Sequence, residues 1–150
     1  MDTYKHILVA VDLSPMTQNL IQRGKQLAEL YNCRLSLIHV LQAMSPVQTF
    51  GEMPLVIDMS FEQDLVIKAR KDLEELAKAA QVPANTLCEV QEGSTPANDI
   101  AFYAAEHQVD LIIMGHTQQT GLKSFLLGST AQSVAKQVKC DLFIMQSAQA

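Results

Sequence analysis

The chain has 150 residues, 48% of them hydrophobic and 18% charged, a composition typical of one soluble domain with a packed core rather than a disordered chain. No apolar stretch reaches about 18 residues, the length that a membrane-spanning helix needs, so a membrane protein is excluded. Eleven basic against sixteen acidic residues give a formal charge of −5, which argues against nucleic-acid and anionic-membrane partners.

Four near-continuous apolar runs predict buried strands of a parallel sheet that is covered on both faces. They occupy residues 5–12, 34–40, 110–115 and 141–145. A fifth run at residues 86–92 alternates more, which favours a strand at the edge of the sheet.

Helical patterns lie between these strands. Ser14-Pro15 fits the N-cap and first-turn proline of a first helix, whose apolar residues recur at helical spacing up to Tyr31. A second apolar stripe runs from Leu65 to Ala80, Thr95-Pro96 opens a third helix, and Gly128-Ser129-Thr130 opens a fourth. This alternation predicts an α/β fold, a three-layer, doubly wound sandwich, as a single domain over residues 1–150.

Residues 42–60 form a long connection that does not fit the compact alternation. The segment contains two prolines and three methionines. Connections of this length are typical of functional lids and mobile insertions. Its apolar residues fit packing on the domain's own surface as well as packing on a protein partner.

The cysteines and the first residues of the chain predict a cytoplasmic location. Cys33, Cys88 and Cys140 are odd in number and widely spaced, which predicts reduced thiols without a disulfide framework or a zinc site. Residues 1–6 run directly into a strand-like segment, so no signal peptide is expected.

Glycines and small polar residues gather after two of the predicted strands. One group is Asp12–Pro15, and the other runs from Gly115 to Thr130. Ligands of an open parallel sheet bind beyond the carboxyl ends of its strands. A glycine turn followed by Gly128-Ser129-Thr130 at a helix start lets backbone N–H groups and hydroxyls approach an anion. The pattern fits a phosphate cradle, and it also fits an ordinary loop with a Ser/Thr helix cap.

Two other phosphate-binding loops are excluded by their spacing. A Walker A loop needs four residues between its glycines and a Lys directly after the second. Here five residues separate Gly115 from Gly121, and Leu122 precedes Lys123. The Gly-x-Gly-x-x-Gly pattern of dehydrogenases is absent after the first strand, so a dinucleotide-binding enzyme is not expected.

Three further segments are informative when they occur together and in this order: Tyr4–Ser14 (YKHILVAVDLS), Leu37–Val40 (LIHV) and Leu126–Ser129 (LLGS). Together they resemble the universal stress protein family over essentially the whole chain. The resemblance implies an adenine nucleotide alpha hydrolase-like fold, whose five-stranded parallel sheet has the order 3-2-1-4-5. It also implies a homodimer that is built through the last strand.

Many members of that family bind ATP through Gly-x2-Gly-x9-Gly-[Ser/Thr]. Gly115 matches the first position of this motif, and Gly128-Ser129 match the last two. Gln118 occupies the position of the middle glycine. It adds a side chain at the place where the backbone would contact phosphate. The loop therefore begins like the branch of the family regarded as not binding ATP and ends like the binding branch.

For a bound nucleotide, the resemblance implies a role for each matching residue near the base and the ribose. The backbone of Ala10, Val11 and Val40 would hold adenine. Asp12 would contact ribose or a phosphate-bound Mg²⁺, and its alternative role is to cap the first helix.

The resemblance assigns the remaining positions to the sugar and the phosphates. Met114 and Gly115 would line the sugar side of the nucleotide. The residues that would present N–H and hydroxyl groups to the triphosphate are Gly128, Ser129, Thr130 and Ala131.

These features predict a homodimeric regulator of the stress response that binds ATP or another adenine nucleotide. The alternative is a nucleotide-free homodimeric interaction module of the same family, with residues 42–60 docking a protein partner. No catalytic constellation is visible, since His116 has no positioned nucleophile beside it and no cluster has metal-ligand spacing. At most, slow ATP hydrolysis or autophosphorylation is expected.

Overall fold

The main sheet has five parallel strands, in a computed structural model that describes residues 3–42, 47–50, 53–56, 59–116 and 128–146. The strands are β1 His6–Val11, β2 Arg34–Gln42, β5 Leu87–Gly93, β6 Leu111–His116 and β7 Asp141–Gln146. Their order across the sheet is β5-β2-β1-β6-β7. Counted along the chain this is the order 3-2-1-4-5, so the predicted doubly wound topology is confirmed.

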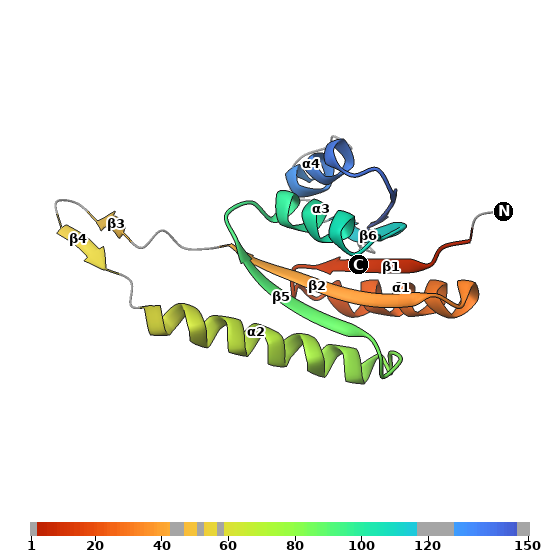
Figure 1. Cartoon of the computed structure of the whole chain (residues 1–150). Coiled ribbons are helices and arrows are strands. Elements are labelled where there is room, and N and C mark those ends of the chain that lie inside the picture. Colours follow the sequence, from red (N-terminus) through yellow and green to blue (C-terminus); the bar gives the residue numbers. More distant parts are fainter. Residues whose placement is uncertain (1–2, 43–46, 51–52, 57–58, 117–127, 147–150) are drawn as a thin grey trace.

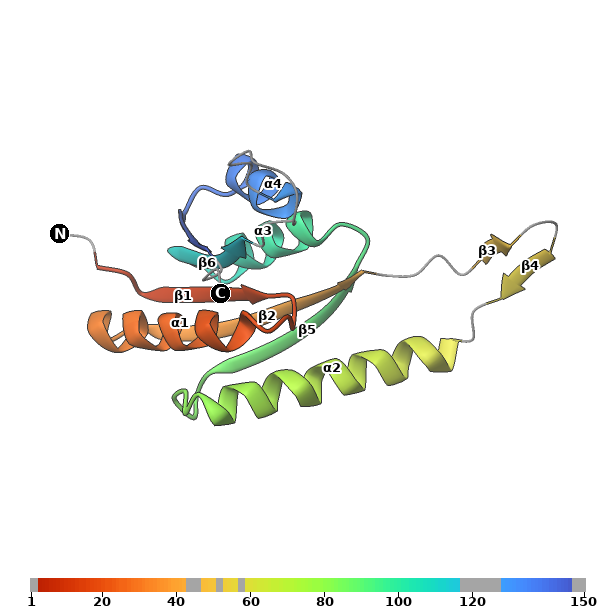
Figure 2. The same cartoon turned by 180° about the vertical axis from the view of Figure 1, so that it is seen from behind.

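Two pairs of helices cover the two faces of this sheet (Figure 1). Helices α1 Thr17–Tyr31 and α2 Met59–Ala79 lie on one face, and α3 Pro96–Glu106 and α4 Ser129–Gln137 lie on the other. The view from behind shows the same three layers (Figure 2). Within the described ranges, every helix is too short or too polar to cross a bilayer.

Alternating side chains of β1 enter two separate hydrophobic clusters. Ile7 and Val9 pack with residues of α1 and α2, whereas Leu8 and Ala10 pack with residues of α3 and β6. All six residues of β1 are buried, because helices cover both faces. This double burial explains why the strand is a continuous apolar run in the sequence.

Helix α1 approaches the sheet closely at Gly24. A Cβ atom at this position would overlap Cγ2 of Val9 and would lie 3.3 Å from Cδ1 of Leu35. The glycine therefore sets the distance between the helix and the first two strands.

The structure differs from the sequence predictions at the starts of two helices. Helix α1 begins at Thr17 with Met16 as its N-cap, so the prediction that Ser14 caps it is wrong. Ser14 instead closes the preceding turn, where its carbonyl accepts the N–H of Thr17 at 3.0 Å. Helix α2 begins at Met59 rather than near Leu65.

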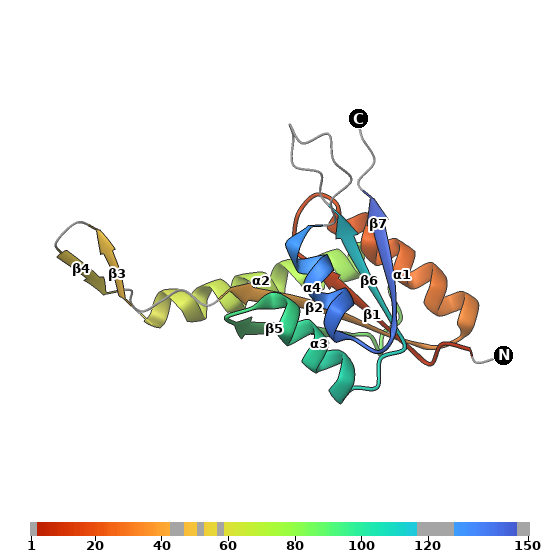
Figure 3. The ribbon, with the colours of Figure 1, turned by 90° about the horizontal axis from the view of Figure 1, so that it is seen from above.

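Part of the predicted connection over residues 42–60 is regular structure. Strands β3 Val47–Phe50 and β4 Met53–Val56 pair antiparallel in a separate two-stranded sheet. This sheet lies away from the five-stranded sheet (Figure 3). Pro54 in β4 removes a backbone donor, which weakens the strand pattern in the sequence. The remainder of the connection, residues 43–46, 51–52 and 57–58, is outside the described ranges.

A buried polar network fixes the start of β1 beneath α3. Nδ1 of His6 donates to the carbonyl of His107 at 3.0 Å, and Nε2 accepts the hydroxyl of Ser36 at 2.7 Å. Burial lowers the pKa of His6, although the bond to His107 acts in the opposite direction. The folded protein therefore favours the neutral imidazole.

We expect His6 to make the folded protein less stable in acid. The unfolded chain binds a proton here below about pH 6.5, whereas the folded chain resists it. This contribution to stability is fully present above that pH and is lost as the pH falls toward the lower folded pKa. Urea unfolding on both sides of pH 6.5 measures the loss, and His6→Gln should show a smaller one. An equal loss in both proteins would contradict this assignment.

Candidate functional site

The carboxyl edge of the sheet opens between β1 and β6. Pairing of β1 with β6 ends at Val9 and Ile113, although β6 continues paired with β7 as far as His116 and Gln146. The order of the strands along the chain reverses between β1 and β6. This place, called the switch point below, is where open parallel sheets bind their ligands.

A sharp turn carries Asp12 at the end of β1. Oδ1 of Asp12 accepts the N–H of Ser14 at 3.0 Å, and Leu13 adopts a left-handed φ of 59°. A leucine in this conformation is strained, a condition that concentrates at functional sites. Asp12 is exposed beside the switch point and does not cap α1, so its predicted alternative role is wrong.

His39 of β2 binds the last residue of β1, a contact that was not predicted from the sequence. Its Nδ1 donates to the carbonyl of Val11 at 2.8 Å. The side chains of Ala10 and Val11 are buried, so only their backbone is available to a ligand. Val40, the next residue of β2, is partly exposed.

Met114 and Gly115 lie at the β6 side of the switch point. Met114 is buried in the cluster beneath α3 and α4, so its side chain is core. A Cβ at Gly115 would lie 2.9 Å from Sδ of Met16. Packing against the Met16 side chain at the start of α1 therefore also favours glycine at this position, besides the predicted nucleotide motif.

The start of α4 provides backbone donors near the end of β6. Gly128 is the N-cap, with φ −54° and ψ 152°, and no side chain caps the helix within the described ranges. Gly128 and Ser129 are exposed, Thr130 is half-buried, and Ala131 is buried. The N–H groups of a first helical turn have no acceptor inside the helix. The N-cap of this helix is thus a glycine and not the Ser or Thr of the alternative, whereas the loop before it lies outside the described residues.

His116 connects the end of β6 to the start of α4. Its Nδ1 accepts the backbone N–H of Gly128 at 3.2 Å, and its side chain is only 8% exposed. The structure therefore brings together the two ends of the predicted phosphate loop. Gln118 and Gly121 lie outside the described residues.

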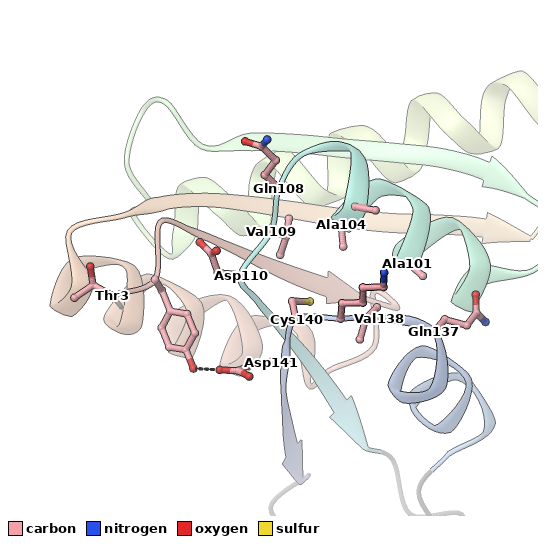
Figure 4. Close-up of a pocket in the computed structure, with 13 residues that line it drawn as sticks. Thr3, Ala101, Ala104, Gln108, Val109, Asp110, Gln137, Val138, Cys140 and Asp141 are labelled. Atoms are coloured by element: carbon pink, nitrogen blue, oxygen red, sulfur yellow. Dashed lines mark hydrogen bonds between the residues drawn. The ribbon is translucent and has the colours of Figure 1, made fainter. Parts of the chain in front are cut away.

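A separate cavity of about 610 Å³ lies at the amino ends of β1, β6 and β7, at the opposite end of these strands from the switch point (Figure 4). It is lined by residues at the end of α3 and in the connection from α4 to β7, together with Tyr4, whose hydroxyl donates to Asp141 at 2.7 Å. None of the predicted nucleotide-binding residues lines it. This cavity is therefore distinct from the predicted site.

Metal and thiol chemistry find little support in the described part of the chain. No cluster of three or more His, Cys, Asp or Glu side chains there has the arrangement of a metal site. Cys33, Cys88 and Cys140 are free thiols, and burial raises the pKa of each. A raised pKa disfavours the reactive thiolate.

Residues 3–146 match the model of the universal stress protein family. The chain belongs to this family. Universal stress protein A homolog 1 from Coxiella burnetii is 36% identical over 142 residues, which cover 93% of this chain and 94% of the homolog. The resemblance expected from the sequence motifs is thereby confirmed.

Solved structures of universal stress proteins share the fold. One, in complex with cAMP, superposes with a TM-score of 0.68 at 21% identity and covers 98% of this chain and 100% of its own. Another, from Archaeoglobus fulgidus in complex with dAMP, has a TM-score of 0.64 at 19% identity and covers 95% and 98%. At these identities the likeness establishes the architecture.

Proposed function

We propose that this universal stress protein binds an adenine nucleotide at the switch point and acts as a homodimeric regulator of the stress response in the cytoplasm. The observation that carries the proposal is the first turn of α4, which begins at Gly128 without a side-chain cap from its N-cap residue and lies beside the open end of β6. The free N–H groups and the positive end of the helix dipole at such a turn favour binding of a phosphate group. Two related folds were solved with cAMP and dAMP, which supports an adenine nucleotide as the ligand.

The phosphates would be held by backbone groups rather than by basic side chains. The N–H groups of Ser129, Thr130 and Ala131 point along the helix toward its N-terminus, where the helix dipole is positive. The hydroxyls of Ser129 and Thr130 add further donors. Because the chain carries a net charge of −5, these local dipoles act against the overall field. We therefore expect a modest affinity.

The base and the ribose would lie across the ends of β1, β2 and β6. The backbone of Ala10, Val11 and Val40 would contact adenine, while Met114 and Gly115 would line the sugar side with their backbone. The carbonyl of Val11 already accepts a hydrogen bond from His39. Adenine would therefore bind other backbone groups of Ala10, Val11 and Val40.

Asp12 would contact ribose or Mg²⁺ bound to the phosphates. Its carboxylate is exposed, and its Oδ1 accepts the N–H of Ser14. Carboxylate oxygens are ligands that Mg²⁺ accepts together with phosphate oxygens. The metal would supply charge neutralisation at the phosphates, so we expect binding of ATP to be stronger with Mg²⁺ than without it.

Nothing in the described residues favours rapid chemistry on the nucleotide. Nδ1 of His39 and Nδ1 of His116 both make hydrogen bonds within the protein, and both side chains are largely buried. We propose a ligand that is retained and regulates the protein, with hydrolysis or autophosphorylation at most slow.

Heat extraction of the purified protein tests retention of the ligand. The supernatant of denatured protein is separated by anion exchange, and released nucleotide is measured by its absorbance and mass. We expect an adenine nucleotide in the extract. Its absence, together with no affinity for added ATP, would favour the nucleotide-free module instead.

Gln118→Gly should strengthen nucleotide binding. The change restores the middle glycine of the family motif and removes a side chain from the place where the backbone is expected to meet phosphate. We expect an affinity for ATP about two- to fivefold higher, which corresponds to about 0.4–1 kcal/mol. Calorimetric titration measures it, with Gln119→Gly as the control for added flexibility. An unchanged affinity would show that the glutamine is tolerated.

The second candidate function is docking of a protein partner through the segment around residues 42–60. The observation that favours it is the exposed apolar side chains where α2 follows this segment, Phe61 at 52% and Ile67 at 66%. The β3–β4 pair also lies apart from the main sheet (Figure 3). Two-stranded sheets alone are marginally stable in water, so a partner would stabilise this one.

The homodimer would form through β7, the last strand and one edge of the sheet. Its residues Leu142, Phe143, Ile144 and Met145 are all only partly buried. An edge strand presents unpaired backbone groups that pair readily with another chain. Sedimentation equilibrium of the full chain tests this, and a monomer at all concentrations would contradict it.

A further inference from the structure

We propose that His116 is a positioning residue that withholds the N–H of Gly128 from phosphate while its imidazole is neutral and releases it when the imidazole is protonated. The affinity for nucleotide then rises as the pH falls. This inference rests on the proposed nucleotide function of the same site. It concerns a bond that the sequence motif alone does not indicate.

The bond closes the phosphate loop at its two ends. Nδ1 of His116 and the N–H of Gly128 are 3.2 Å apart, although the residues are twelve positions apart in the chain. β6 and β7 hold the backbone of His116, since His116 pairs with Gln146. Gly128 is the N-cap of α4, so the bond ties the helix start to a fixed strand.

The bond requires a neutral imidazole. A neutral ring has one acceptor nitrogen, and here the acceptor is Nδ1, since it receives a backbone N–H. In the protonated ring both nitrogens are donors, so the N–H of Gly128 loses its acceptor. The freed N–H then joins the N–H groups of the first turn of α4.

Protonation of His116 also adds a positive charge beside the first turn of α4. His116 lies on the face of β6 that α3 and α4 cover. Every second residue of a strand faces the same side, and Ile112 and Met114 belong to the cluster on that face. An imidazolium there is a cation near the start of α4, where an anionic phosphate is expected. Both effects favour the anion in the protonated state.

The other groups around His116 do not duplicate this switch. From β1, the charged neighbour at the same edge is Asp12, and from β7 the paired residue is the uncharged Gln146. Helix α4 has no acidic residue in its first turn, and its Lys136 lies in the last turn. The facing end of α4 therefore brings no second titrating group within the described residues. Helix α3 carries Asp99 in its first turn, but this carboxylate lies against Gly93 of β5, which β2 and β1 separate from β6.

Calorimetric titration with Mg²⁺–ATP at about pH 8 and about pH 6, across the range where histidine titrates, tests the inference. In the wild type we expect affinity to be at least about tenfold higher at the lower pH, the effect of one hydrogen bond to a charged group. His116→Asn is the matched variant. Its Oδ1 keeps an acceptor near the position of Nδ1, but it does not titrate.

The variant also corrects for the ligand, because ATP itself gains a proton in this range. The ratio of wild-type to His116→Asn affinity should rise toward low pH, and cAMP, whose phosphodiester charge stays constant, should show the same rise. A constant ratio with both ligands would overturn the inference and leave nucleotide binding intact. Absence of binding at both pH values would overturn the proposed function as well.

The Gly128 amide gives a readout that needs no ligand and no variant. In ¹⁵N–¹H spectra of the wild type, its resonance should shift with the protonation of His116 and return on raising the pH. If His116→Asn folds poorly, this titration decides alone. A Gly128 resonance that does not follow the histidine would overturn the inference.

Discussion

Gly128→Val is expected to weaken nucleotide binding by at least about 100-fold, the equivalent of two lost charge-assisted hydrogen bonds. The branched side chain would cover the N–H groups at the start of α4, where the phosphates are expected. The fold should survive, because among the described residues a Cβ at Gly128 would meet no atom nearer than Nδ1 of His116 at 4.0 Å. Its φ of −54° is also allowed for every residue.

The matched control for this variant is Ala135→Val, at an exposed position of the same helix. It introduces the same β-branched side chain away from the helix start. Calorimetric titration with Mg²⁺–ATP should show wild-type affinity for the control. Equal affinity in Gly128→Val would mean that the phosphates do not bind at the start of α4. Circular dichroism and thermal unfolding check that both variants fold.

Gly24→Val is expected to cause the largest loss of stability, about 3 kcal/mol in the free energy of unfolding. Its Cβ would overlap Val9 and crowd Leu35, both of which are buried in the same cluster. The helix would have to move away from three central strands, since Ile113 of β6 also lies within 3.8 Å. For a protein of ordinary stability this is a large share of the total.

Gln26→Val is the control, because residue 26 is exposed in the same helix. This variant measures the loss of helix propensity that valine causes, without any contact of the new side chain with the sheet. Urea unfolding of both variants against the wild type gives the difference. If the two variants lose similar stability, the close approach of α1 at Gly24 does not limit the packing of this fold.

The strands were predictable because burial on both faces leaves a continuous apolar signal. The runs at residues 110–115 and 141–145 predict β6 and β7 to within one residue at each end. The start of α2 was not predictable in the same way. Periodicity reports the side of a helix that packs on a core, and Phe61 and Ile67 in its first turns are exposed.

The location of the candidate site was predictable, but its internal bonds were not. Strand order and the Gly128-Ser129 motif place Asp12, Gly115 and the start of α4 at one edge of the sheet. The bonds of His39 to Val11 and of His116 to Gly128 join residues 28 and 12 positions apart. Such pairs depend on the register of the strands and on the return of the loop, which no local pattern specifies.

Gly115 shows why a matched motif position needs a structural check. The sequence motif assigns this glycine to nucleotide binding. In the structure, Sδ of Met16 lies 2.9 Å from where its Cβ would be, so a larger residue would displace the end of the Met16 side chain, and packing also favours glycine here. Gly128 has no such close contact with the described residues, of which the nearest atom to its Cβ would be Nδ1 of His116 at 4.0 Å. The backbone of Gly128 is therefore the better test of the phosphate site.

Calorimetric titration of the nucleotide-stripped full chain with Mg²⁺–ATP tests the central proposal most directly. We expect one site per chain with a dissociation constant below about 1 mM, a free energy of binding stronger than about −4 kcal/mol. We also expect the affinity to fall with added salt, because backbone dipoles hold the phosphates. No heat of binding up to millimolar ATP would contradict the account and leave the nucleotide-free interaction module as the function of this fold.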